Sequence, residues 1–243
     1  MSLGAAHAAP HAVFVTGTDT EIGKTCVSAA LLRVCARRGL RAAGIKLVAA
    51  GMDEIDGRWI NEDVAALKAA SSAPLSDAET GPVQLRTACA PHLAAHREGV
   101  ALERAGFRAH VQRMATRAQV LVIEGVGGFC VPMSAPNAEP RWGMNDVAAD
   151  LALPVVLVVG LRLGALNHAL LSAQAVSAQG LRLAGWVCNR IDPAMPLADE
   201  NLATLKAWMP APCLGDVPHL DDPHPEAVAD ALDADAVLRA LNL

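Results

Sequence analysis

Short, strongly apolar runs alternate along the chain with longer segments in which apolar residues recur every three to four positions. Runs of the first kind predict buried strands, and they occupy residues 12–16, 41–48, 120–128, 154–160, 183–188 and 213–214. Segments of the second kind predict helices at residues 24–38, 61–70, 101–117, 144–151, 164–179 and 197–209, with a last helix after residue 225. Strands that alternate with helices in this way are typical of an α/β fold, here a doubly wound, mostly parallel sheet with helices on both faces.

The pattern contains no internal repeat and no linker, so we expect a single domain over residues 12–243. Residues 1–11 are rich in alanine but lack a basic start and a long apolar segment, which predicts a disordered extension rather than a signal peptide. Residues 71–97 and 129–142 are irregular in pattern and are expected to form loops.

The first predicted strand leads into a glycine-containing turn that ends in Gly-Lys-Thr and is followed by the first predicted helix. Residues 17–25 fit the phosphate-loop pattern, in which backbone N–H groups surround the phosphates of a nucleotide. In this pattern Lys24 reaches the β- and γ-phosphates, and the hydroxyl of Thr25 ligates Mg²⁺. The N-terminus of the helix adds its positive end to the same anion site. The flanking strand and helix favour nucleotide binding over a chance glycine turn.

Two further charged residues stand near the carboxyl ends of predicted strands, where ligands bind in parallel α/β sheets. Glu124 ends a hydrophobic run and precedes three nearby glycines, which let the backbone approach a ligand. A carboxylate there matches the group that holds Mg²⁺ or its water, and the alternative is a helix-capping or solvent-facing side chain. Lys46 is either a functional cation or a solvated strand end.

The composition excludes several classes of protein. Hydrophobic residues make up 53% of the chain, yet the longest apolar runs are far too short to cross a bilayer, so we expect a soluble, cytoplasmic protein that does not bind membranes. The net charge of −5, without a basic stripe and interleaved aromatic residues, argues against a nucleic-acid surface. The six cysteines have no paired short spacing, as expected for reduced residues rather than a disulfide or zinc framework.

Several motifs together resemble one family, the dethiobiotin synthetases, over nearly the whole chain. The motifs are Val-Thr-Gly-Thr-Asp-Thr-Glu-Ile-Gly-Lys-Thr at 15–25, Gly-Ile-Lys at 44–46, Ala-Pro-His at 90–92, Glu-Gly-Val-Gly-Gly at 124–128, Gly-Ala-Leu-Asn-His at 164–168, Ala-Gly-Trp-Val-Cys-Asn at 184–189, Pro-Ala-Pro at 210–212 and Leu-Gly-Asp-Val-Pro at 214–218. The first of these is a highly specific version of the phosphate loop. Members of this family have the P-loop NTPase fold and are ATP-dependent ligases that close the ureido ring in biotin synthesis.

The resemblance implies a reaction. 7,8-Diaminopelargonate takes up CO₂ on one amine as a carbamate, ATP phosphorylates the carbamate, and the second amine attacks the mixed anhydride to form the ring. The products are dethiobiotin, ADP and phosphate, and Mg²⁺ accompanies ATP. The resemblance also implies a homodimer in which the loop at residues 164–167 reaches the substrate of the neighbouring subunit.

The resemblance further assigns roles to residues. It implies catalysis by Lys46 and Lys24, and Mg²⁺ binding by Thr25, Asp63 and Glu124. ATP binding is implied for Glu21, Ile22, Gly23, Lys24, Thr25, Cys26, Asp63, Glu124, Gly125, Val126, Gly127, Asn189, Arg190, Pro218, His219 and Leu220. Substrate binding is implied for Thr20, Lys46, Ala50, Pro91 and Asn167. Within the ATP set, Asn189 resembles the asparagine that reads adenine.

The sequence also departs from the family at three positions. The serine or threonine that usually follows the lysine motif is missing, because Ala49 and Ala50 stand there. Ala90 replaces the serine of a common Ser-Pro-His, and Val126 replaces an alanine. A lost hydroxyl removes about 0.5–1.5 kcal/mol of binding where nothing replaces it, so the chain is expected to bind the diamine less tightly than relatives that keep both hydroxyls.

Two other readings were open from the sequence. A related ligase acting on cobyrinic acid would normally carry a glutaminase domain, for which 243 residues leave no room. A regulatory ATPase that positions septa or plasmids usually has a second lysine early in the phosphate loop, where this chain has Thr18. Such proteins often carry a basic amphipathic tail, whereas residues 226–243 are acidic and contain only Arg239 as a cation.

Overall fold

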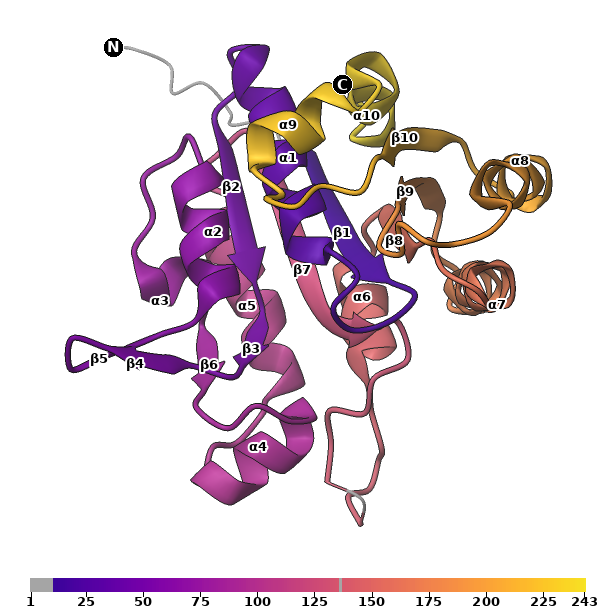
Figure 1. Ribbon diagram of the computed structural model, residues 1–243. Coiled ribbons are helices and arrows are strands. Elements are labelled where there is room, and N and C mark those ends of the chain that lie inside the picture. Colours follow the sequence, from indigo (N-terminus) through magenta and orange to yellow (C-terminus); the bar gives the residue numbers. More distant parts are fainter. Residues whose placement is uncertain (1–10, 136) are drawn as a thin grey trace.

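A central sheet of six parallel strands organises the part of the chain that the computed structural model describes, residues 11–135 and 137–243 (Figure 1). Its strands are β1 (His11–Gly17), β2 (Ala42–Lys46), β7 (Val120–Gly128), β8 (Val155–Gly160), β9 (Leu183–Asn189) and β10 (Cys213–Val217). They lie in the order β10-β9-β8-β1-β7-β2, and each neighbouring pair is parallel. The expected extension falls largely outside the described residues, while His11 already belongs to β1.

Helices cover both faces of this sheet, which confirms the predicted doubly wound architecture. They are α1 (Lys24–Arg37), α2 (Glu62–Ala70), α3 (Asp77–Thr80), α4 (Pro91–Glu98), α5 (Arg104–Met114), α6 (Met144–Leu151), α7 (Ala165–Ala178), α8 (Ala198–Trp208), α9 (Pro225–Asp230) and α10 (Ala234–Ala240). Figure 1 shows α9 and α10 beside α1, and α7 and α8 together beyond β8 and β9.

Alternation along the strands explains why the helices form two layers. In β1, Val13 and Val15 pack into the core beneath α1, α9 and α10, whereas Phe14 points to the opposite face and packs with α5 and α6. In β8, Val158 belongs to the α1 side, and Leu157 packs with α7 and α8. Successive side chains of a strand point to opposite faces, so a strand buried on both faces is apolar throughout.

Two small sheets beside the main one correct the sequence prediction. The expected strand at 41–48 is two strands, because β2 ends at Lys46 and a separate β3 (Val48–Ala50) pairs with β6 (Val83–Leu85). A hairpin of β4 (Asp53–Ile55) and β5 (Arg58–Ile60) follows. Three-residue strands are too short to leave a periodic signal.

Helix boundaries required further corrections. The stretch at 71–97, expected to be loops, contains α3, β6 and most of α4, and the expected helix at 101–117 is the shorter α5. The last segment forms two helices, α9 and α10, instead of one. In the described residues no helix is long and apolar enough to cross a membrane.

Candidate nucleotide and substrate site

The phosphate loop lies between β1 and α1, at the carboxyl edge of the sheet. Glu21 and Gly23 both have left-handed backbone conformations, with φ of 57° and 82°. At Gly23 a side chain is also excluded by space, since a Cβ would lie 2.3 Å from Asn189 Nδ2. The buried Lys24 turns back into the loop, where its Nζ donates a hydrogen bond of 2.6 Å to the backbone carbonyl of Asp19.

A cluster of two carboxylates, one lysine and one hydroxyl lies next to this loop. Lys46 Nζ lies 2.6 Å from Glu124 Oε1 and 2.7 Å from Asp63 Oδ2. The Thr25 hydroxyl lies 2.9 Å from Glu124 Oε1 and 2.6 Å from Asp63 Oδ1, so its one hydrogen is shared between the two carboxylates. The cluster thus joins Thr25 and Lys46, two residues predicted from the sequence, with both predicted Mg²⁺ carboxylates.

The fold explains how the cluster assembles. Lys46 and Glu124 are direct partners in the register of the neighbouring strands β2 and β7, so both side chains extend on the same side. Asp63 lies in the first turn of α2, where the positive end of the helix favours a carboxylate. Thr25 lies in the first turn of α1. Sequence reasoning predicted each position separately but not the direct pairing of Lys46 with both acids.

Burial and charge set the protonation of these groups. Burial alone would lower the pKa of Lys46, but Glu124 and Asp63 raise it above its ordinary value, so the ammonium stays charged. Burial alone would raise the pKa of Asp63, and Lys46 and Thr25 bring it below its ordinary value. For Lys24, burial and then repulsion from Lys46 lower the pKa to about 8.

The same groups fit a magnesium ion. Glu124 is fully buried, and among the described residues its Oε2 has no hydrogen-bond partner. Hydroxyl and carboxylate oxygens are the ligands that Mg²⁺ prefers, and this ion usually takes one or two carboxylates together with substrate phosphates. In the described part of the chain no group of three or more His, Cys, Asp or Glu side chains forms a self-contained metal site. The cluster therefore fits Mg²⁺ that arrives with a nucleotide.

A cavity of about 190 Å³ lies on the other side of the phosphate loop. It is lined by Glu21, Gly23, Cys26, Val27, Asn189, Arg190, Ile191, Val217, Pro218, His219, Leu220, Pro223 and Val228. Asn189 Nδ2 donates a hydrogen bond of 2.9 Å to the Ile22 carbonyl, which leaves its side-chain oxygen available to a ligand. The Arg190 guanidinium instead makes a two-pronged pair with Asp216, with both contacts at 2.8 Å. The residues expected to hold the base are thus brought together.

The predicted substrate residues are spread more widely. Thr20 is exposed at the phosphate loop, Ala50 ends β3, and Pro91 begins α4. Asn167 lies in the first turn of α7 and is exposed. Asn167 belongs to α7, which follows β8, and the strands β1 and β7 lie between β8 and β2, the strand that ends at Lys46.

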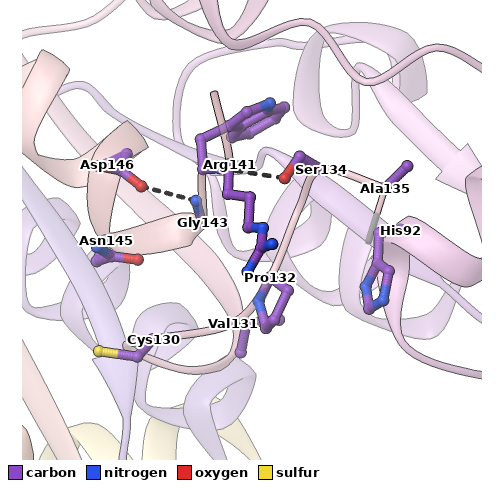
Figure 2. Close-up of a pocket in the computed structure, with 11 residues that line it drawn as sticks. His92, Cys130, Val131, Pro132, Ser134, Ala135, Arg141, Gly143, Asn145 and Asp146 are labelled. Carbon is purple, nitrogen blue, oxygen red and sulfur yellow. Dashed lines mark hydrogen bonds between the residues drawn. The ribbon is translucent and has the colours of Figure 1, made fainter. Parts of the chain in front are cut away.

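A second cavity, of about 470 Å³, lies between the start of α4, the loop after β7 and the start of α6 (Figure 2). Figure 2 shows Cys130 and Asp146 on one side of it and His92 on the other. Val131 lines this cavity and lies near Thr20 of the phosphate loop, with Gly127 between them. A Cβ built on Gly127 would lie 2.9 Å from Val131 Cγ2 and 3.5 Å from Thr20 Oγ1. The cavity thus adjoins Thr20 and Pro91.

Sequence reasoning missed the contacts that two residues make in this region. Asn61 caps α2 by accepting from the Val64 N–H, and its Nδ2 donates a 2.6 Å hydrogen bond to the Gly51 carbonyl, which fixes the helix that carries Asp63. The sequence predicts a helix that begins at Asn61 but was not used to assign this residue a capping role, for which asparagine before Glu-Asp is a signal. Arg162 forms an ion pair with Asp19 of the phosphate loop. No local sequence pattern predicts this ion pair, because 143 residues separate Arg162 from Asp19.

Comparisons with known proteins agree with this geometry. The AAA domain family matches residues 11–227. The MinC:MinD cell division protein complex of Aquifex aeolicus has a similar structure, with a TM-score of 0.57 at 11% identity over 96% of both chains. A ParA family ATPase of Chlorobium tepidum TLS gives 0.53 at 13% identity, over 95% of this chain and 91% of that one. The fold and the phosphate loop define the class of P-loop NTPases.

A closer relative identifies the family within that class. The ATP-dependent dethiobiotin synthetase BioD of Aromatoleum aromaticum is 50% identical over 223 residues, which cover 92% of this chain and 97% of the relative. The chain belongs to the ATP-dependent dethiobiotin synthetase family. This confirms the resemblance found in the sequence and sets aside the regulatory-ATPase reading, which shares only the fold.

Proposed function

We propose that the protein works in the cytoplasm and forms dethiobiotin from 7,8-diaminopelargonate, CO₂ and ATP. The name of its relative, an ATP-dependent dethiobiotin synthetase, supports the product and the use of ATP. The observation that carries this proposal is the cluster of Lys24, Lys46, Thr25, Asp63 and Glu124 beside the phosphate loop. Phosphoryl transfer to a carbamate brings two anions together, and its main requirement is positive charge at fixed positions. The buried Lys24 of the phosphate loop and the buried Lys46 at the end of β2 supply such charge.

Each group has a distinct part in this reaction. Lys24 leaves the Asp19 carbonyl and contacts the β- and γ-phosphates. Thr25, Asp63 and Glu124 would hold Mg²⁺, which would offset the phosphate charge. Lys46 holds the carbamate and the phosphoryl group during transfer, and no strong base is needed because the carbamate oxygen is already anionic. The second amine then attacks the mixed anhydride carbon, phosphate leaves, and the ring closes.

The two cavities provide places for the rest of the ligands. The smaller one takes the adenine, with Asn189 facing the base edge and Pro218, His219 and Leu220 beside it. The larger one adjoins Thr20 and Pro91 and offers room for the carbon chain of the diamine. We further propose a homodimer in which Asn167 contacts the neighbouring subunit's substrate. The family resemblance implies this arrangement, and the position of α7 after β8, two strands away from β2, supports it.

The experiment is ADP release by the purified protein with ATP, Mg²⁺ and bicarbonate, with and without the diamine, and with the product identified by mass. We expect ADP release that depends on the diamine and yields dethiobiotin. Lys46→Met should abolish the product, while Lys68→Met, on an exposed helix face, should not. ADP release that does not depend on the diamine would contradict the proposal.

A further inference from the structure

Lys46 occupies the position between the two carboxylates that the proposed function assigns to the metal. Its ammonium bridges Glu124 Oε1 and Asp63 Oδ2 at 2.6 and 2.7 Å, and its side chain is only 4% exposed. Because Glu124 Oε1 also faces the Thr25 hydroxyl, one carboxylate oxygen serves two donors. The lysine is therefore a built-in counterion rather than a free cation waiting for substrate.

The charges of this site balance without any metal. Lys24 and Lys46 carry two positive charges, and Asp63 and Glu124 carry two negative ones. A divalent ion that entered alone would leave an excess of two positive charges. Such entry is unfavourable, because uncompensated charge in a buried site is costly. An ion that enters with the phosphates of a nucleotide brings its own negative charge. The charge balance therefore disfavours binding of a free metal ion and allows binding of a metal–nucleotide complex.

The geometry of the cluster is a second obstacle to the binding of free metal. Lys46 occupies Glu124 Oε1 and Asp63 Oδ2, whereas Glu124 Oε2 has no hydrogen-bond partner among the described residues. A magnesium ion needs ligand oxygens at about 2.0–2.1 Å in near-octahedral surroundings. Lys46 must therefore withdraw before a metal takes the position between the two carboxylates that its ammonium fills. The ammonium is then available to an anionic group on the adjacent ligand.

We propose that Lys46 blocks the metal site of the free protein, so that divalent metal enters only together with nucleotide phosphates and its entry frees Lys46 for the anionic substrate. This inference rests on the proposed function for the identity of the substrate. It fixes an order of events, in which the metal–nucleotide complex precedes capture of the carbamate. Lys46 is then both the group that excludes free metal and the group that the nucleotide complex releases.

The test measures the binding of Mn²⁺ to nucleotide-free protein. Binding is monitored through the electron paramagnetic resonance signal of the free ion. Wild type should take up Mn²⁺ only when ADP is added. Lys46→Met leaves two unbalanced carboxylates and should bind Mn²⁺ without nucleotide at least about tenfold more tightly than wild type. The matched control Lys68→Met, which removes the same charge on the surface, should behave as wild type. The double variant Lys46→Met with Glu124→Gln should lose the gained site.

Wild type that binds Mn²⁺ equally well with and without ADP, or a folded Lys46→Met that gains no affinity, would overturn the proposal. Circular dichroism establishes whether the variant is folded. A second measurement needs no variant, because the chain has only four lysines and ¹⁵N-lysine labelling gives a simple side-chain spectrum. The buried Lys46 ammonium signal should be unchanged by Mg²⁺ alone and should shift with Mg²⁺ and ADP. A shift with Mg²⁺ alone would also refute the block. Neither readout uses the diamine, so failure of the ring-closing assay would leave the blocked metal site standing and would remove only the identity of the anionic substrate that Lys46 then holds.

Discussion

At the residue scale, we expect the protonation of Lys24 to control nucleotide binding. Burial and the neighbouring Lys46 lower the pKa of Lys24 to about 8, so the free site loses this positive charge as pH rises past that value. Because the phosphates require the charged form, ADP affinity should fall about tenfold between pH 7 and pH 9. Calorimetric titration with ADP over this range measures the effect. Lys24→Met should bind weakly at every pH, and an equally steep pH dependence in that variant would assign the titration to another group.

Ala50 is the second site for a single-residue test. It ends β3, four residues after Lys46, at a position where the family resemblance leads us to expect a hydroxyl in relatives. A hydroxyl restored there should contribute about 0.5–1.5 kcal/mol to substrate binding, so Ala50→Ser should lower the KM for the diamine about two- to tenfold. Steady-state kinetics at saturating ATP measures this. The control is Ala88→Ser, on the exposed loop after β6. An unchanged KM in Ala50→Ser would show that a hydroxyl at this position does not contribute to substrate binding.

At the element scale, α4 lacks an N-terminal cap. Its N-cap residue is Ala90, which makes no side-chain hydrogen bond to the first turn. Serine at an N-cap satisfies one of the free N–H groups and typically stabilises by about 1 kcal/mol, so Ala90→Ser should raise Tm by about 2–4 °C. Thermal unfolding followed by circular dichroism measures the shift. Ala109→Ser, at an exposed interior position of α5, should leave Tm unchanged or lower it slightly, and equal shifts in both variants would contradict a capping effect.

The same elements show how far the sequence predicts this structure. Lys24 and Thr25 were predictable because the phosphate loop is one continuous segment with its strand and helix attached. The short β3 and β6 were not, since three residues give no period and their pairing joins positions 35 residues apart. Helix α4 was missed although Pro91 at its first position and Gly99 after its end, with φ of 66°, are helix-boundary signals. The pairing of Lys46 with Asp63 depends on α2 packing beside β2, which only the tertiary structure provides.

At the scale of the whole molecule, the proposed homodimer has a direct test, because β1 and β7 separate the strand that ends at Lys46 from the strand that precedes the helix of Asn167. If one subunit supplies Lys46 and its partner supplies Asn167 to each site, then Lys46→Met and Asn167→Ala should each be nearly inactive as pure dimers. A mixed dimer of the two variants contains one doubly altered site and one intact site. Random mixing makes half of the dimers mixed, so dethiobiotin formation should recover to about a quarter of the wild-type rate. Subunits exchanged under mild denaturant and assayed for product measure this. If Asn167 served its own chain instead, both sites of the mixed dimer would remain defective and no activity would return.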